Sequence, residues 1–161
     1  MEKISLESAK RGRSMVTYRI MTIEDYEGVY TVWINTPGMG LNTTDDSREG
    51  IEKYLKRNPT TSFVAEYDGS IVGVIMAGHD GRRGYIHHAA VLSTYRTQGI
   101  GKNLVDHAMS ALEEEGIHKV ALVAFKKNDI GNGFWEHIGF TERDDVVYRN
   151  KNSHFLDRID T

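Results

Sequence analysis

Apolar residues recur along this chain with two periods, one typical of strands and one typical of helices. Runs rich in β-branched, aromatic and other apolar residues predict six strands, at residues 16–22, 61–67, 70–78, 85–91, 119–125 and 144–150. Apolar positions at helical spacing predict four helices, at about residues 23–34, 45–57, up to 115 after the fourth strand, and 129–138. The order β-α-α-β-β-β-α-β-α-β is typical of an α/β (α+β) fold with a mixed sheet.

Local signals place several element ends. Asp68-Gly69 lies between two strand-like runs and predicts an antiparallel hairpin. Thr22, with Asp25 three residues on, resembles a helix N-cap with an acidic first turn. Gly116 follows the third helical run, where a C-terminal cap belongs. The run at 119–125 is continuously apolar and therefore predicts a buried strand.

Length and composition indicate a single soluble domain. We expect residues 1–14 to form a mobile tail and residues 15–161 to fold as one domain, because 161 residues suffice for a real core. A net charge of −3 disfavours nucleic acid and anionic membranes as partners. With no apolar run long enough to span a bilayer and no signal peptide, the sequence predicts a cytoplasmic monomer or homodimer. The absence of cysteine excludes disulfides, thiolate metal sites and a cysteine acyl-enzyme.

The stretch "YRTQGIGKNL" at 95–104 carries the most specific chemical signal. A nucleotide P-loop would need glycine at Arg96 and Ser or Thr at Asn103. A dinucleotide fingerprint would need glycine at Leu104. Both templates therefore fail. What remains is Arg96-x-x-Gly99-x-Gly101 between a strand and a helix, which presents backbone N–H groups at a positive helix end and predicts a pyrophosphate site.

This stretch, together with "NDIGNGFWEHIGF" at 128–140, resembles the GCN5-related N-acetyltransferase (GNAT) superfamily. The resemblance covers roughly residues 16–148. It implies a mixed, mostly antiparallel sheet flanked by helices, acetyl-CoA as the donor, and no metal. The implied activity is N-acetyl transfer to a primary amine by direct attack in a ternary complex.

The resemblance also implies a set of cofactor-binding residues. The backbone of Ala89, Ala90 and Val91 would pair with the pantetheine arm as an added strand. The pyrophosphate would lie on residues that extend from the end of the strand into the helix, namely Arg96, Thr97, Gln98, Gly99, Ile100, Gly101 and Lys102. Asn128 and Phe134 would line the cofactor, although Asn128 fits a simple helix N-cap equally well.

Two basic pairs remain open to two interpretations. Arg82-Arg83 and Lys126-Lys127 would either screen the terminal phosphate of CoA or lie solvated on the surface.

An amine acceptor must lose a proton before it attacks the thioester. For an amine of pKa near 10.4 the deficit at neutral pH is about 4.6 kcal/mol, which a general base relieves. The family often places a carboxylate where this chain has His87, and the pKa of histidine, near 6.5, suits the role. Strand alternation predicts that only one of His87 and His88 faces the acetyl group. His87 is the predicted base, Tyr85 a neighbour that shapes the site, and Glu66 the reserve candidate.

The chain departs from the family pattern at Trp135, which stands where many members carry a tyrosine that protonates the departing thiolate. An indole N–H is no usable acid near neutral pH, so protonation would come from water, His137 or the thiol itself. Trp135 and the lack of a carboxylate at position 87 therefore support a second hypothesis, an acyl-CoA-binding module without turnover.

Two further expectations concern the reacting groups. Residues 35–46 are expected to form one wall of the acceptor site, where Asp45 and Asp46 either hold a cation or begin a helix. The thioester oxygen is expected to accept from the backbone N–H of Val91 or Leu92.

Overall fold

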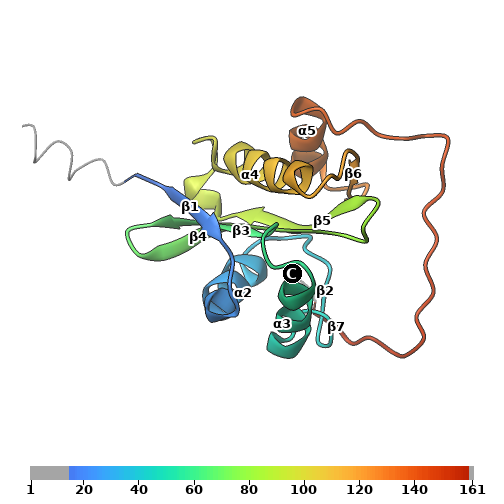
Figure 1. Cartoon of the computed structure of the whole chain (residues 1–161), viewed down its shortest axis with the longest axis horizontal. Coiled ribbons are helices and arrows are strands. Elements are labelled where there is room, and N and C mark those ends of the chain that lie inside the picture. Colours follow the sequence, from blue (N-terminus) through green and yellow to red (C-terminus); the bar gives the residue numbers. More distant parts are fainter. Residues whose placement is uncertain (1–14, 160–161) are drawn as a thin grey trace, which may run out of the picture.

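A computed structural model describes residues 15–159, so the predicted tail at residues 1–14 lies outside the described residues. A five-stranded sheet runs through the middle of the molecule (Figure 1). Its spatial order is β1 (Thr17–Ile20), β3 (Phe63–Tyr67), β4 (Ser70–His79), β5 (Gly84–Val91) and β6 (Val120–Ala121). The first three neighbouring pairs are antiparallel, and β6 pairs parallel to β5. The predicted mixed, mostly antiparallel sheet is confirmed.

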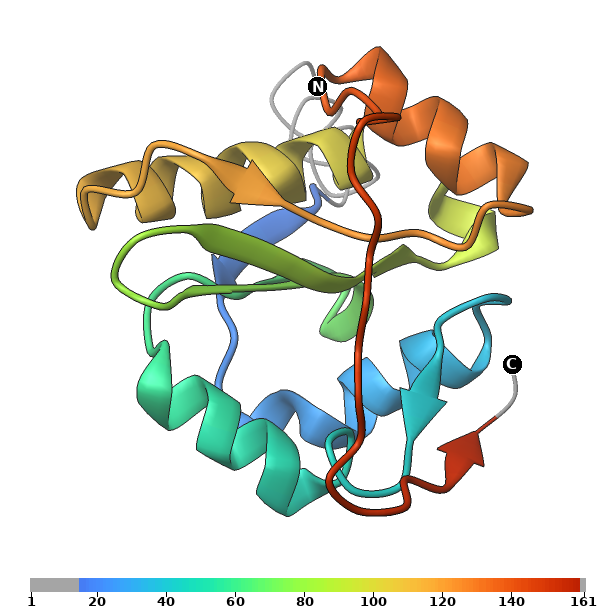
Figure 2. The ribbon, with the colours of Figure 1, turned by 90° about the vertical axis from the view of Figure 1, so that its right-hand side faces the viewer.

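Helices cover both faces of the sheet (Figure 2). One face carries α4 (Ile100–Glu114) and α5 (Asp129–His137), and the other carries α2 (Tyr26–Ile34) and α3 (Arg48–Arg57). Short 3₁₀ turns, η1 (Ile23–Asp25) and η2 (Ser93–Tyr95), precede α2 and α4. A separate pair of short strands, β2 (Leu41–Asn42) and β7 (Arg158–Ile159), lies outside the five-stranded sheet.

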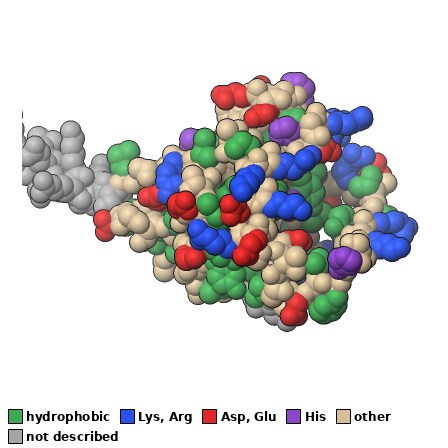
Figure 3. All heavy atoms as spheres, turned by 60° about the horizontal axis from the view of Figure 1, so that its bottom comes forward, with side chains coloured by type: hydrophobic (Ala, Val, Ile, Leu, Met, Phe, Trp, Pro, Cys, Tyr) green, Lys and Arg blue, Asp and Glu red, His purple; other side chains and the backbone are tan. Residues whose placement is uncertain are grey.

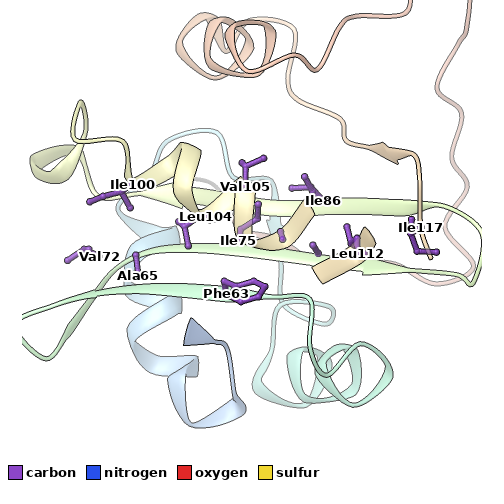
Figure 4. Close-up of a cluster of buried hydrophobic side chains, with 12 residues drawn as sticks. Phe63, Ala65, Val72, Ile75, Ile86, Ile100, Leu104, Val105, Leu112 and Ile117 are labelled. Carbon is purple, nitrogen blue, oxygen red and sulfur yellow. The ribbon is translucent and has the colours of Figure 1, made fainter. Parts of the chain in front are cut away.

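The core consists of one apolar layer on each side of the sheet. On the α4 side, Ile100, Leu104 and Leu112 pack onto Ile75 and Ile86, and all are at most 3% exposed (Figure 4). On the other side, residues of α2, α3 and the strands, including Trp33, pack together. The strand β4 is continuously apolar because both of its faces are covered.

The predicted hairpin is confirmed at Asp68-Gly69, which joins β3 to β4 with positive φ angles of 51° and 77°. Positive φ at both central residues is the requirement of a type I′ turn, whose twist matches that of the strands.

Gly69 and Gly133 offer a test of backbone strain, because a Cβ at either position meets nothing within 4 Å. We expect Gly69→Ala to destabilise the fold by about 1 kcal/mol, since alanine disfavours a left-handed φ. Gly133 lies inside α5, so Gly133→Ala is expected to stabilise it by up to about 1 kcal/mol. Urea denaturation measures both free energies, and shifts of the same sign would contradict this explanation.

Two predicted strands differ from the structure. The run at 119–125 is paired only at Val120–Ala121, and Val123 and Phe125 beyond it are 56% and 45% exposed. This run is the edge of the sheet, so it is not buried on both sides. Residues 144–150 do not form a strand. They belong to a long extended segment that is anchored by α5 at one end and by β7 at the other, and within the described chain no strand pairs with their backbone (Figure 1).

The start of α3 also differs from the prediction, which placed it at Asp45. The side chain of Asn42 accepts from the backbone N–H groups of Thr44 and Asp45, and the N-cap is Ser47, whose hydroxyl accepts from the Gly50 N–H at 3.0 Å. Asp46 therefore lies in the turn before the helix and is 3% exposed.

Candidate functional site

The loop between β5 and α4 presents a row of backbone N–H groups. Thr97 and Gly99 have positive φ angles of 66° and 77°, which turn the chain sharply into the helix. The first α4 bond runs from the Asn103 N–H to the Gly99 carbonyl at 3.0 Å. The N–H groups of Ile100, Gly101 and Lys102 therefore have no acceptor within the helix. Because these groups lie at the positive end of the helix dipole, the predicted anion cradle has a physical basis.

The two glycines of this cradle serve different purposes. A Cβ at Gly99 would meet nothing within 4 Å, but its φ of 77° favours glycine. A Cβ at Gly101 would lie 3.2 Å from the ring of Phe134. Gly101 thus allows α5 to pack closely onto α4, a purpose that the sequence pattern did not reveal. The Lys102 ammonium is ion-paired with Asp106 at 2.8 Å.

The edge of β5 nearest the cradle is open. β6 pairs only with Gly84 and Tyr85, so beyond them the edge of β5 that faces away from β4 has no strand partner in the described chain. The Leu92 N–H donates to the Val72 carbonyl at 2.9 Å and is therefore occupied. Since ladder bonds alternate along an antiparallel pair, the Val91 N–H points toward the open edge. Of the two expected oxyanion donors, only Val91 is available.

A β-bulge places His87 and His88 on the same side of the sheet. Val74 pairs with Ala90 and Met76 pairs with His87, so two β5 residues oppose one β4 residue. His88 has a positive φ of 46°. The two rings lie 6.2 Å apart, and both contact residues from the α2 and α3 side. The expectation that strand alternation would separate the histidines is wrong, because a bulge interrupts the alternation.

The two histidines differ in their surroundings. The ring of His87 packs against Tyr85, with centroids 4.5 Å apart, and against Tyr54 at 5.8 Å. Desolvation, followed by the nearby charge of His88, lowers the pKa of His87 below its usual 6.5. The His88 Nε2 instead lies 2.7 Å from the Asp46 carboxylate, in a pair whose side chains are 17% and 4% exposed. Because its pKa is lowered, the His87 ring is neutral at pH 7, which is the state that a general base requires.

Glu66 lies apart from the histidines. It is on β3, where it pairs with Ile71 near one end of β4, whereas His87 pairs with Met76 near the other end. The carboxylate of Glu66 forms an ion pair with Arg19, which also binds Asp25 at 2.6 Å. The structure does not bring Glu66 together with the predicted base.

The second predicted motif forms the start and the inner face of α5. The Asn128 side chain accepts from the Gly131 N–H at 3.0 Å and thus caps the helix. Phe134 contacts Trp135 with centroids 5.0 Å apart, and Trp135 contacts Phe140 at 5.3 Å. All three rings pack at the edge of the α4 core. Packing is therefore the observed contribution of Trp135.

The predicted acceptor wall, residues 35–46, reaches both sides of the site. Asp46 binds His88 on β5, and a Cβ at Gly40 would lie 3.3 Å from the ring of Phe125, which precedes α5.

The two basic pairs lie away from the cradle or are open to solvent. Arg82-Arg83 occupies the turn before Gly84, at the end of β5 opposite the cradle, and Lys126-Lys127 is exposed. Acidic and basic side chains are mixed over much of the face in Figure 3.

Two features are absent from the described residues. Within residues 15–159, no helix is both long and apolar enough to cross a bilayer. The same residues hold no group of three or more His, Cys, Asp or Glu side chains arranged to bind a metal ion.

The sequence model of the acetyltransferase (GNAT) family matches residues 25–140, which include strands β3 to β6 of the sheet, the cradle and α5. The chain belongs to the GNAT family of acetyltransferases. A relative, an acetyltransferase of Pectobacterium atrosepticum, is 32% identical over 129 residues, covering 80% of this chain and 90% of that protein. An acetyltransferase of Sodalis glossinidius is 31% identical, covering 83% and 92%.

Solved structures share the GNAT fold. The PaiA N-acetyltransferase of Thermoplasma acidophilum, in complex with coenzyme A, has a TM-score of 0.70 at 19% identity and covers 91% of this chain and 99% of that one. A predicted acetyltransferase of Clostridium acetobutylicum, with acetyl-CoA, has a TM-score of 0.68 at 22% identity, covering 84% and 96%. At these identities the likeness shows the fold alone.

Proposed function

We propose that this GNAT protein transfers the acetyl group of acetyl-CoA to a primary amine by direct attack in a ternary complex. The observation that carries the proposal is the unpaired edge of β5 leading into the N–H cradle at Gly99, with the histidine pair on the same strand. Solved structures of this fold with coenzyme A or acetyl-CoA bound support the choice of donor.

Each part of the donor has a proposed partner. The open edge at Ala89–Val91 would pair with the amide groups of the pantetheine arm, as an added strand does. Residues 96–102 would hold the pyrophosphate on backbone N–H groups, with the exposed Arg96 guanidinium nearby. Asn128 and Phe134 would line the cofactor beside α5. A metal is not part of this proposal.

The proposed reaction is a single acyl transfer. The amine nitrogen attacks the thioester carbon, the oxygen takes the negative charge and accepts from the Val91 N–H, and the C–S bond breaks to release the CoA thiolate. His87 takes the proton that the amine loses. This relieves the deficit of about 4.6 kcal/mol that a protonated amine of pKa near 10.4 faces at pH 7.

Glu66 and Trp135, the other two predicted catalytic residues, do not act on the substrate in this proposal. Glu66 is held by Arg19 and is separated from His87 by β4, so we assign the base to His87. Trp135 packs between Phe134 and Phe140, and water would protonate the thiolate. The same packing is what favours the second candidate function, an acyl-CoA-binding module without turnover.

The acceptor and the setting are also proposals. One structure of this fold is an aminoglycoside N-acetyltransferase in complex with CoA, with a TM-score of 0.66 at 20% identity. We propose an amine acceptor, either a small molecule or a protein amine, for a cytoplasmic monomer or homodimer. A net charge of −3 supports the absence of nucleic-acid and membrane partners from this proposal.

The deciding experiment incubates the protein with acetyl-CoA and a panel of amines, and reads free thiol with a chromogenic disulfide. The panel includes lysine peptides, peptide N-termini, polyamines, amino acids and aminoglycosides. We expect thiol release above the acetyl-CoA hydrolysis background with at least one amine. Tight acetyl-CoA binding without release against any of them would favour the binding module instead.

A further inference from the structure

His88 is held in a left-handed backbone conformation, which is uncommon for a residue with a side chain. Its φ of 46° occurs within the bulge of β5. Such a conformation costs of order 1–3 kcal/mol and persists only where neighbouring groups hold it. Two hydrogen bonds do so here. The Asp46 carboxylate lies 2.7 Å from the ring Nε2, and the indole of Trp33 donates to the His88 carbonyl at 3.1 Å.

Both partners of His88 are themselves buried and fixed. Trp33, on α2, is fully buried, and its ring meets the His88 ring edge-on with centroids 5.2 Å apart. Asp46 accepts from the Asn42 N–H at 2.8 Å with its second carboxylate oxygen. The backbone carbonyl of Asp46 accepts from the hydroxyl of Tyr26 at 2.6 Å. The acceptor wall, α2 and the bulge of β5 are therefore joined at one point.

We propose that the His88–Asp46 hydrogen bond is a positioning clasp, which fixes the β5 bulge and the acceptor wall relative to each other. This inference rests on the proposed acetyl transfer. The clasp lies three residues before Val91, whose N–H would receive the thioester oxygen, and next to His87, the proposed base. The clasp therefore holds β5, which would bind the acetyl donor, and the acceptor wall in the arrangement that attack requires. A displacement of the reacting groups by about 1 Å costs of order 100-fold in rate.

His88 acts here through geometry and is not the group that takes the proton from the amine. One ring nitrogen is engaged by a buried carboxylate, and the ring is covered by Trp33. His87 is the histidine whose lowered pKa leaves it neutral at pH 7. Asp46, on this reading, is a structural partner and not a cation ligand for the acceptor.

Four variants separate the clasp from a base. His88→Ala and Asp46→Ala break the hydrogen bond, and we expect kcat to fall about 10- to 100-fold, with little change in KM for acetyl-CoA. The double variant should lose no more than either single variant, because both remove one interaction. Asp46→Asn retains hydrogen-bonding capacity without charge and should keep kcat within about 3-fold. If His88 were instead a general base oriented by the Asp46 carboxylate, kcat would fall far more in Asp46→Asn.

The pH profile supplies the second readout. We expect the acidic limb of kcat/KM to persist in His88→Ala, because His87 remains. Loss of that limb in His88→Ala, or a collapse of kcat in Asp46→Asn, would make His88 the base and overturn the proposal. Unchanged kcat in both alanine variants would overturn it as well.

Hydrogen exchange tests the clasp without catalysis. In the substrate-free protein, His88→Ala and Asp46→Ala are expected to raise amide exchange at residues 41–47 and 88–91, while exchange in α4 stays as in the wild type. Unchanged exchange in those two segments would overturn the clasp. If the wild type transfers no acetyl group to any amine but exchange rises as expected, the proposed function fails and the clasp remains as a structural link.

Discussion

Gly99→Glu is expected to weaken acetyl-CoA binding at least about 100-fold. The new carboxylate would stand beside the N–H groups that open α4 and would face the pyrophosphate. Two like charges at about 4 Å repel by about 4 kcal/mol at a protein surface, and salt reduces this value. A loss of about 2.7 kcal/mol corresponds to the 100-fold change. Titration calorimetry with acetyl-CoA measures it.

Gly116→Glu is the matched control for this charge. Gly116 has a φ of 80° against 77° for Gly99, lies at the opposite end of the same helix, and also has open space around its Cβ position. Backbone strain is therefore similar, and acetyl-CoA affinity should change less than about 3-fold. Gly99→Ala adds the backbone strain at position 99 without the charge, so its acetyl-CoA affinity should lie between those of Gly99→Glu and Gly116→Glu. Equal affinities for all three variants would remove the pyrophosphate site from α4.

His87→Ala is expected to lower kcat by about 100-fold or more at pH 7, within the range for loss of a general base. The wild-type base is neutral above its lowered pKa, so the activity due to His87 is present at pH 7 and is lost as pH falls through a value below 6.5. In the variant this acidic limb should disappear. The rate deficit should also shrink toward pH 10, because the amine there loses its proton to water.

His118→Ala serves as the control for this substitution, because His118 is exposed after the C-terminal end of α4. It should leave both the rate and the pH profile unchanged. A His87→Ala variant with the wild-type rate between about pH 6 and pH 9 would show that His87 is not the general base, and water or His88 would then be the candidates for that role.

The outcome at β5 shows where prediction from sequence ends. The strand itself, the hairpin before it and the glycine cradle after it were predicted, because each depends on residues close together in the chain. The bulge at His88 has no such local signal. It exists because Trp33 and Asp46, which are distant in sequence, hold a backbone conformation that His88 would otherwise avoid.

The same limit explains the two strand errors. The apolar run at 119–125 and the run at 144–150, which contains Val146, Val147 and Tyr148, have the composition of strands, but a strand needs a partner backbone. β5 supplies one for only two residues of the first run, and the second run has none among the described residues. The predicted separation of His87 from His88 failed for a related reason, since the period of two holds only in an uninterrupted ladder.

The sequence by itself determined the order of most elements, the turn at Asp68-Gly69 and the glycine turn that opens α4 at Gly99, because glycine conformation, helix ends and short-range periodicity act over a few residues. Only the tertiary structure decided that Gly101 accommodates Phe134, that Glu66 belongs to Arg19, and that Asp46 clasps His88. Each of these contacts joins residues at least 33 positions apart, counted from Gly101 to Phe134. Chain packing alone brings such residues together.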